Sequence, residues 1–318
     1  MKFIIFIIFV LMFVFFGSSV FGHDDAIRVE TNLVTVNVAI TDKNGKFVKN
    51  LRREQFEIFD NRQKQQIADF SIQAAPVTYG IVYDMHPTTA ERTAAVLEAL
   101  RAFTKELRPA DRFFVVAFNQ KGSLSVDFVP TIEQLEKNLP DRREPNSLYD
   151  AIYLAAGKLR QSPNLKRTLI VISDSADHGS RHSFSDLSKN LKNLDAQVYA
   201  VIFDEDNPYY RDVTLDGNQR RPFSRDATAL DRAAIQDLTL KSGGAAHFPI
   251  GENSRMLYEI YSDIAAEMQR QYAISFYPTS TDGKWHDLRI NLRDADGSKK
   301  FALTYRQGYQ SPTVKNEK

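Results

Sequence analysis

Four short and almost continuously apolar runs in the middle of the chain constrain its fold more than any other feature. Each run has the length of a strand, and segments with helical periodicity separate them. Strands that lack polar alternation are typical of a parallel sheet covered by helices on both faces. The runs cover residues 78–83, 112–118, 168–172 and 198–203. The sequence therefore predicts an α/β fold with a doubly wound, mostly parallel sheet over residues 76–270.

Strands of a different kind flank this block. Residues 27–72 alternate with a period of two, as half-buried strands do, and Asn44-Gly45 between them is turn chemistry. Three more strands are predicted between residues 271 and 305. Neither group is large enough to bury its own faces. We expect both to combine into one small β-sandwich, with an N-terminal part at 23–75, a C-terminal part at 271–310 and a disordered tail at 311–318.

The first 22 residues have the three-part pattern of a secretory signal peptide. Lys2 is followed by an apolar run over residues 3–16 and then by small residues up to Gly22. A retained membrane anchor is the alternative, but about 20 apolar residues are needed to span a bilayer. No later segment is long and apolar enough to do so. We therefore expect cleavage after Gly22 and a secreted or periplasmic protein without a transmembrane segment.

Composition excludes several functions. The chain has 41 basic and 40 acidic residues, so it has no overall field for holding nucleic acid. It contains no cysteine, which excludes disulfides, thiolate metal sites and a cysteine nucleophile.

Aspartates follow three of the apolar runs, at Asp84, Asp174 and Asp204. Ligands of such sheets bind beyond the carboxyl ends of the strands. If Asp84 and Asp174 converge there, their carboxylates suit a hard divalent cation such as Mg²⁺ or Ca²⁺. Helix capping is the alternative, because aspartate is common where a strand leads into a helix.

The order of several short motifs resembles the von Willebrand factor type A (VWFA) domain. The whole mature chain resembles bacterial secreted VWFA-related proteins of the acidobacterial type. The motifs in the middle of the chain are residues 81–84, 147–152 and 169–174, and those in the flanking parts are residues 36–60, 272–278 and 305–309.

This resemblance implies a metal ion-dependent adhesion site in a degenerate form. Asp84 and Asp174 match the two aspartates of that site, and Thr88 matches its second serine. His86 replaces the first serine, and Asn146 with Ser147 stands where threonine is usual. The implied cation is Mg²⁺, Ca²⁺ or Mn²⁺, or Zn²⁺ or Ni²⁺ if His86 is a ligand, since imidazole suits those ions. In that case His178 and His182 are further candidates at the same edge.

The resemblance also implies what the protein does. Type A domains chiefly mediate protein contacts, so we expect adhesion-type binding of another protein or surface ligand at the C-terminal edge of the sheet, and no catalysis. Arg142, Arg143, Tyr209 and Tyr210 are the candidate partner contacts. Two alternatives are open, a metal-independent envelope scaffold and a metallohydrolase that uses the paired carboxylates.

Overall fold

The computed structural model describes most of the chain after residue 32. It describes residues 33–72, 75–84, 90–118, 124–126, 147–173, 177, 179–203, 225–249, 253–293 and 301–313. Residues 32–318 form one compact unit. The predicted signal peptide lies outside the described residues. Among the described helices, none is both long and apolar enough to cross a membrane.

The apolar runs form the predicted sheet. Its strand order is β10-β9-β8-β5-β6-β7, and neighbours are parallel except at the edge, where β7 is antiparallel to β6. All six described side chains of β9 are buried, which explains why its sequence lacks polar alternation. The strands are β5 (Val77–Asp84), β6 (Arg112–Phe118), β7 (Leu124–Val126), β8 (Lys166–Ser173), β9 (Gln197–Ile202) and β10 (Ala246–His247).

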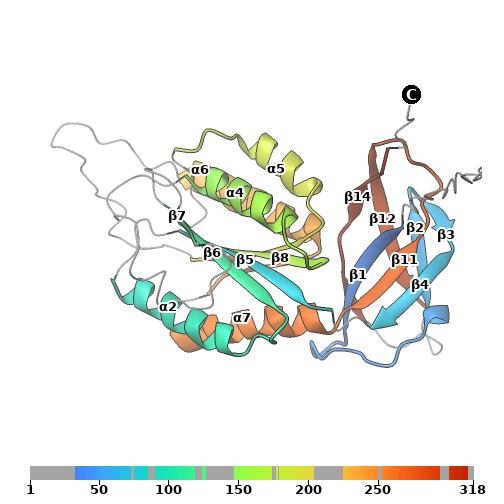
Figure 1. Cartoon of the computed structure of the whole chain (residues 1–318), viewed down its shortest axis with the longest axis horizontal. Helices are drawn as coiled ribbons and strands as arrows, with labels where there is room; N and C mark the ends of the chain where they lie inside the picture. Colours follow the sequence, from blue (N-terminus) through green and yellow to red (C-terminus); the bar gives the residue numbers. More distant parts are fainter. Residues whose placement is uncertain are drawn as a thin grey trace, which may run out of the picture. The chain divides into compact units, whose positions relative to one another are not determined.

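Helices cover both faces of this sheet (Figure 1). One apolar core joins α2 and α7 to the sheet, and a second joins α4, α5 and α6 to its other face. The predicted doubly wound α/β fold is therefore confirmed. The helices are α2 (Ala90–Lys105), α4 (Leu148–Arg160), α5 (Phe184–Lys192), α6 (Arg225–Ser242) and α7 (Ser254–Gln269).

The Gly243-Gly244 pair ends α6. Gly243 has a φ of +82°, a conformation that glycine adopts without strain. Its N–H donates to the carbonyl of Leu240, and the Gly244 N–H donates to that of Thr239. These two bonds are the Schellman pattern, which satisfies carbonyls at a helix end.

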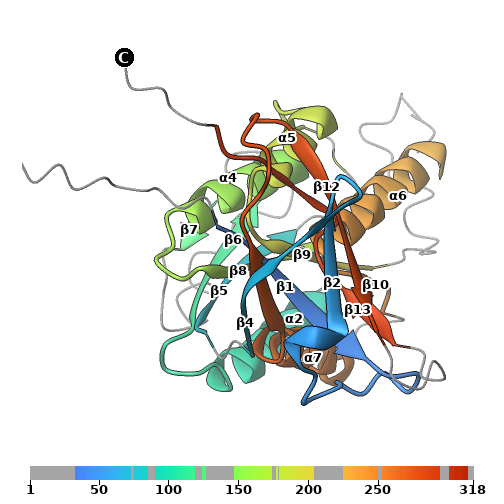
Figure 2. The ribbon, with the colours of Figure 1, turned by 90° about the vertical axis from the view of Figure 1, so that its right-hand side faces the viewer.

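Head and tail strands interleave in two antiparallel sheets, so the predicted β-sandwich is confirmed (Figures 1 and 2). The sheet orders are β13-β1-β11-β4 and β14-β12-β2-β3. Val36 lies opposite Ile274, and Ile58 lies opposite Ile290. The head elements are β1 (Val34–Thr41), the 3₁₀ turn η1 (Arg53–Gln55), β2 (Phe56–Asp60), β3 (Gln63–Gln65) and β4 (Ile67–Ile72). The tail strands are β11 (Tyr272–Phe276), β12 (Trp285–Leu292), β13 (Ala302–Thr304) and β14 (Gly308–Gln310).

A buried polar group joins the sandwich to its C-terminal segment. His286 Nδ1 lies 2.8 Å from Asp60 Oδ1, and the Tyr309 hydroxyl donates to Asp60 Oδ2 over 2.9 Å. Beyond β14, Ser311 N–H donates to the carbonyl of Lys284, and Thr313 forms a bridge with residue 282. Ser311 and Thr313 are therefore bonded to the sandwich, and the tail boundary predicted at residue 311 stays a prediction. The boundaries predicted at residues 75/76 and 270/271 stay predictions.

Candidate functional site at the C-terminal edge of the parallel sheet

Strands β5 and β8 bring the two candidate metal-binding positions to one edge. The strands are parallel neighbours, and Tyr83 lies opposite Ile172 in their register. Asp84 is the last residue of β5, and position 174 directly follows Ser173, the last residue of β8. The order of the chain predicts that both aspartates end strands, but only the structure shows that these strands are adjacent. For Asp84, the structure describes the backbone and not the side chain.

Ser147 is the one residue of the predicted adhesion site whose side chain is described. It is the N-cap residue of α4, and its carbonyl accepts the Ala151 N–H at 3.0 Å. Its hydroxyl makes no capping hydrogen bond with the described part of the helix. The remaining predicted residues lie outside the described parts of the chain, namely His86, Thr88, Asn146 and Asp174 as ligands, His178 as a further histidine, and Arg142, Arg143, Tyr209 and Tyr210 as partner contacts.

The loop after β8 caps α4 in place of Ser147. Asp177 Oδ1 accepts the Tyr149 N–H at 3.1 Å, and Ser180 Oγ accepts the Asp150 N–H at 3.1 Å. Ser180 Oγ in turn donates to Asp177 Oδ1 over 2.6 Å. The first N–H groups of a helix have no partner within it, and the positive end of the helix dipole favours a carboxylate there. The loop is therefore tied to the start of α4.

Asp150, in the first turn of α4, holds the other end of this loop. Its carboxylate accepts the N–H of Arg181 at 3.1 Å and that of His182 at 3.0 Å, and His182 Nδ1 lies 2.7 Å away. Burial raises the pKa of Asp150, but these hydrogen bonds outweigh burial and hold the pKa below its usual value. The carboxylate is therefore ionised and occupied by the loop at neutral pH.

His182 has a structural partner on each side. Its ring pairs with Asp150 and stacks on Tyr153, with ring centroids 4.0 Å apart. Among the residues that the structure describes, no three His, Asp or Glu side chains are arranged to hold a metal ion. His182 thus supports the loop, and the sequence interpretation that grouped it with His86 and His178 missed this role. The motif at 147–152 includes Asp150, but nothing in it indicates which loop residues the carboxylate would bind.

Comparison with known proteins finds similarities among solved structures alone. No family model matches the chain, and no curated protein matches it. Among solved structures, it is similar to the conserved hypothetical protein BatB from Bacteroides thetaiotaomicron, at 15% identity over 60% of this chain and 98% of that one, with a TM-score of 0.42. It is also similar to a von Willebrand factor type A protein from Catenulispora acidiphila, at 11% identity over 90% and 76%, with a TM-score of 0.45. A third similar structure is the ArnB paralog VWA2 from Sulfolobus acidocaldarius, at 10% identity over 89% and 76%, with a TM-score of 0.40.

Proposed function

We propose that the chain is an exported protein-binding module whose ligand docks at the C-terminal edge of the parallel sheet. In this proposal Asp84, Thr88, Asn146, Ser147 and Asp174 form a degenerate metal ion-dependent adhesion site. The cation is Mg²⁺, Ca²⁺ or Mn²⁺, with His86 at its side. The observation that carries the proposal is the adjacency of β5 and β8, which end in register beside the start of α4.

Electrostatics support a cation at this edge. Two carboxylates at the ends of neighbouring strands repel one another, and a bound divalent cation removes that repulsion. Asp150 and Asp177 are already engaged by the loop and the helix, so in this proposal the strand-end aspartates supply the carboxylate ligands. A cation with an open coordination position then accepts a carboxylate from a partner.

The loop after β8 is held in place before any ligand binds, which supports a binding site at this edge. Asp177 accepts a backbone hydrogen bond from the start of α4, and Asp150 of α4 accepts the backbone N–H groups of Arg181 and His182. A surface that is ordered before its ligand arrives loses less conformational entropy on binding. Export rests on the pattern of residues 1–22, and mass spectrometry of the mature protein tests it, with an N-terminus at His23 as the expected result.

Metal binding is tested first, with Mn²⁺ as the probe for the full mature chain. Calorimetry and the electron paramagnetic resonance of free Mn²⁺ give the number and affinity of bound ions. We expect one ion per chain, with the affinity lost in Asp84→Ala and Asp174→Ala. Asp69→Asn is the matched control, because Asp69 is an exposed carboxylate in β4 of the sandwich.

Partner binding is tested next. The immobilised protein captures partners from the envelope fraction of its source, with and without EDTA, and Asp84→Ala and Asp69→Asn serve as parallel baits. Capture that EDTA and Asp84→Ala both abolish supports the proposal. Capture that neither changes indicates a metal-independent scaffold, and metal-dependent turnover of an ester or phosphoester substrate indicates a hydrolase. Either result would replace the proposal.

A further inference from the structure

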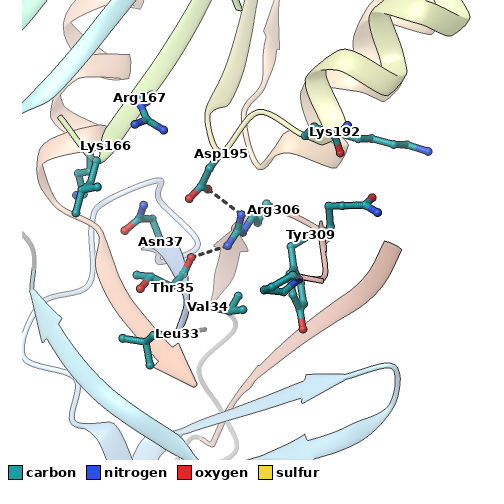
Figure 3. Close-up of a pocket in the computed structure, with 14 residues that line it drawn as sticks. Leu33, Val34, Thr35, Asn37, Lys166, Arg167, Lys192, Asp195, Arg306 and Tyr309 are labelled. Carbon is teal, nitrogen blue, oxygen red and sulfur yellow. Dashed lines mark hydrogen bonds and ion pairs between the residues drawn. The ribbon is translucent and has the colours of Figure 1, made fainter. Parts of the chain in front are cut away.

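A pocket of about 410 Å³ lies at the opposite end of β8 from the candidate metal site (Figure 3). Its walls come from β1, from the first residues of β8, from the segment between α5 and β9, and from the chain around β14. Its volume is within the range of sites that hold small ligands or single side-chain groups of a partner. It shares no residue with the proposed edge site.

The pocket is strongly basic. Lys166, Arg167, Lys192 and Arg306 line it, against the single carboxylate of Asp195. Arg306 already neutralises that carboxylate, since Nη1 lies 2.8 Å from Asp195 Oδ1. Its Nη2 donates to the carbonyl of Thr35 over 2.7 Å, so Arg306 joins two walls of the pocket (Figure 3). An excess of positive charge is left for a ligand.

Two of these cations have no carboxylate partner among the described residues. Arg167 Nη2 donates to the carbonyl of Ser162, and its buried Nε lacks a hydrogen-bond partner within the described structure. The Lys192 ammonium lies 5.5 Å from the centre of the Trp285 ring, a cation–π contact that leaves its charge uncompensated. A carboxylate that approaches either cation gains a favourable electrostatic interaction.

Apolar side chains also line the pocket. Leu165 is 79% exposed and Leu33 is 42% exposed, and both line the pocket with Pro312. Large exposed apolar side chains that group together indicate an interaction surface. The ligand that matches this surface carries a carboxylate next to an apolar group.

The pocket wall also includes the edge of a sheet. Tyr309 and Gln310 belong to β14, which is the outermost strand of the β14-β12-β2-β3 sheet. Edge strands have backbone groups that can pair with an added extended segment. This favours a peptide chain over a free small molecule as the source of the carboxylate.

We propose that this pocket binds an acidic, extended peptide segment of a partner protein, with one acidic side chain of the segment at Arg167, another at Lys192, and an apolar side chain against Leu33 and Leu165. This second site is independent of the metal ion at the other end of the sheet. The protein then holds one ligand at each end of the sheet.

The test uses two blocked peptides with a neutral fluorophore, the acidic Ac-SLEELS-NH₂ and its uncharged counterpart Ac-SLQQLS-NH₂. Fluorescence anisotropy with the full mature chain at low salt measures affinity. The emission of Trp285, the only tryptophan, reports whether the ligand reaches Lys192. We expect the acidic peptide alone to bind and to change Trp285 emission, with an affinity that falls as salt increases.

Three variants locate the site. Arg167→Gln and Lys192→Gln should each weaken binding of the acidic peptide about tenfold, because each removes a charge-assisted hydrogen bond. Lys189→Gln is the matched control, because Lys189 is exposed on the same helix as Lys192 and does not line the pocket. Urea unfolding midpoints equal to that of the wild type show that the variants are folded.

Several results would overturn the proposal. They are equal binding of the two peptides, no binding of the acidic peptide at millimolar concentration, or a loss in Lys189→Gln as large as that in Lys192→Gln. Free glutamate that competes as well as the peptide would overturn the assignment to a peptide. EDTA should leave this binding unchanged, so failure here and failure of the metal site are separate outcomes.

Discussion

The buried carboxyl of Glu267 predicts how the stability of the protein depends on pH. It lies near the end of α7, and its Oε1 is buried without a hydrogen-bond partner among the described residues. Burial raises the pKa of this carboxyl to about 7, although its interaction with the Tyr199 hydroxyl opposes the increase. Burial also raises the pKa of Tyr199 well above its ordinary value, and the neighbouring Glu267 charge adds to that effect. The carboxyl therefore takes up and releases its proton near neutral pH.

The consequence is a stability that depends on pH. The folded protein keeps this proton up to about pH 7, whereas the unfolded chain releases it near pH 4.5. The folded state binds more protons between these values, so the free energy of unfolding falls as pH rises through the window. The two pKa values correspond to about 3 kcal/mol. Glu267→Gln removes this dependence, and the variant should be more stable than the wild type by about that amount at pH 8 and by little at pH 4.5.

Urea unfolding followed by circular dichroism at pH 5, 6, 7 and 8 measures the difference between the two proteins. Glu259→Gln, on the exposed side of the same helix, is the control and should follow the wild type at every pH. If the difference between wild type and Glu267→Gln is the same at pH 5 and pH 8, the carboxyl does not titrate in this window and the reasoning is refuted.

Three further substitutions test the start of α4, the core of the parallel sheet and the sandwich. Asp177→Ala removes the cap of α4 and should lower the free energy of unfolding by about 1 kcal/mol in a urea titration; an unchanged value would show that another group caps the helix. Gly80→Ala places a Cβ 2.8 Å from the Phe114 ring, so calorimetry should show a lower Tm, equivalent to about 1 to 3 kcal/mol, and an unchanged Tm would mean that the ring moves freely. Asp60→Ala leaves the buried His286 without its nearest carboxylate and should cost about 3 kcal/mol or more in unfolding experiments; a loss below 1 kcal/mol would contradict the buried pairing.

The regular elements follow closely from local sequence patterns. Continuous apolar runs became the parallel strands, because helices cover both faces of that sheet. The Asn44-Gly45 turn formed as expected, with Gly45 at a φ of +76° and its N–H bonded to the Asp42 carbonyl. Glycine likewise marked the end of α6. In each case the signal that predicts the element lies in residues that are close together in the chain.

The sequence does not predict two short strands, because one lacks apolar residues and the other is too short to show a pattern. The strand β3, Gln63–Gln65, is entirely polar, and β14, Gly308–Gln310, has three residues. Each exists because a longer strand provides a hydrogen-bonding edge, β2 for the first and β12 for the second. A strand defined by its neighbour has no hydrophobic period of its own.

The two proposed binding regions also differ in how much of them the sequence predicts. The sequence placed Asp84 and Asp174 at strand ends, while the adjacency of β5 and β8 came from the sheet. The basic pocket had no signal in the sequence, since Arg167 and Arg306 lie far apart along the chain and meet only when the sandwich packs beside β8.

By itself, the sequence determined the kinds of most elements and the order in which they occur, because hydrophobic period and turn chemistry act over a few residues. Only the tertiary structure decided which strand ends are neighbours, how Asp150 and Asp177 hold the loop at the edge, and where unpaired positive charge gathers. These features depend on contacts between residues that are distant in the chain, and such contacts leave no periodic pattern in the sequence.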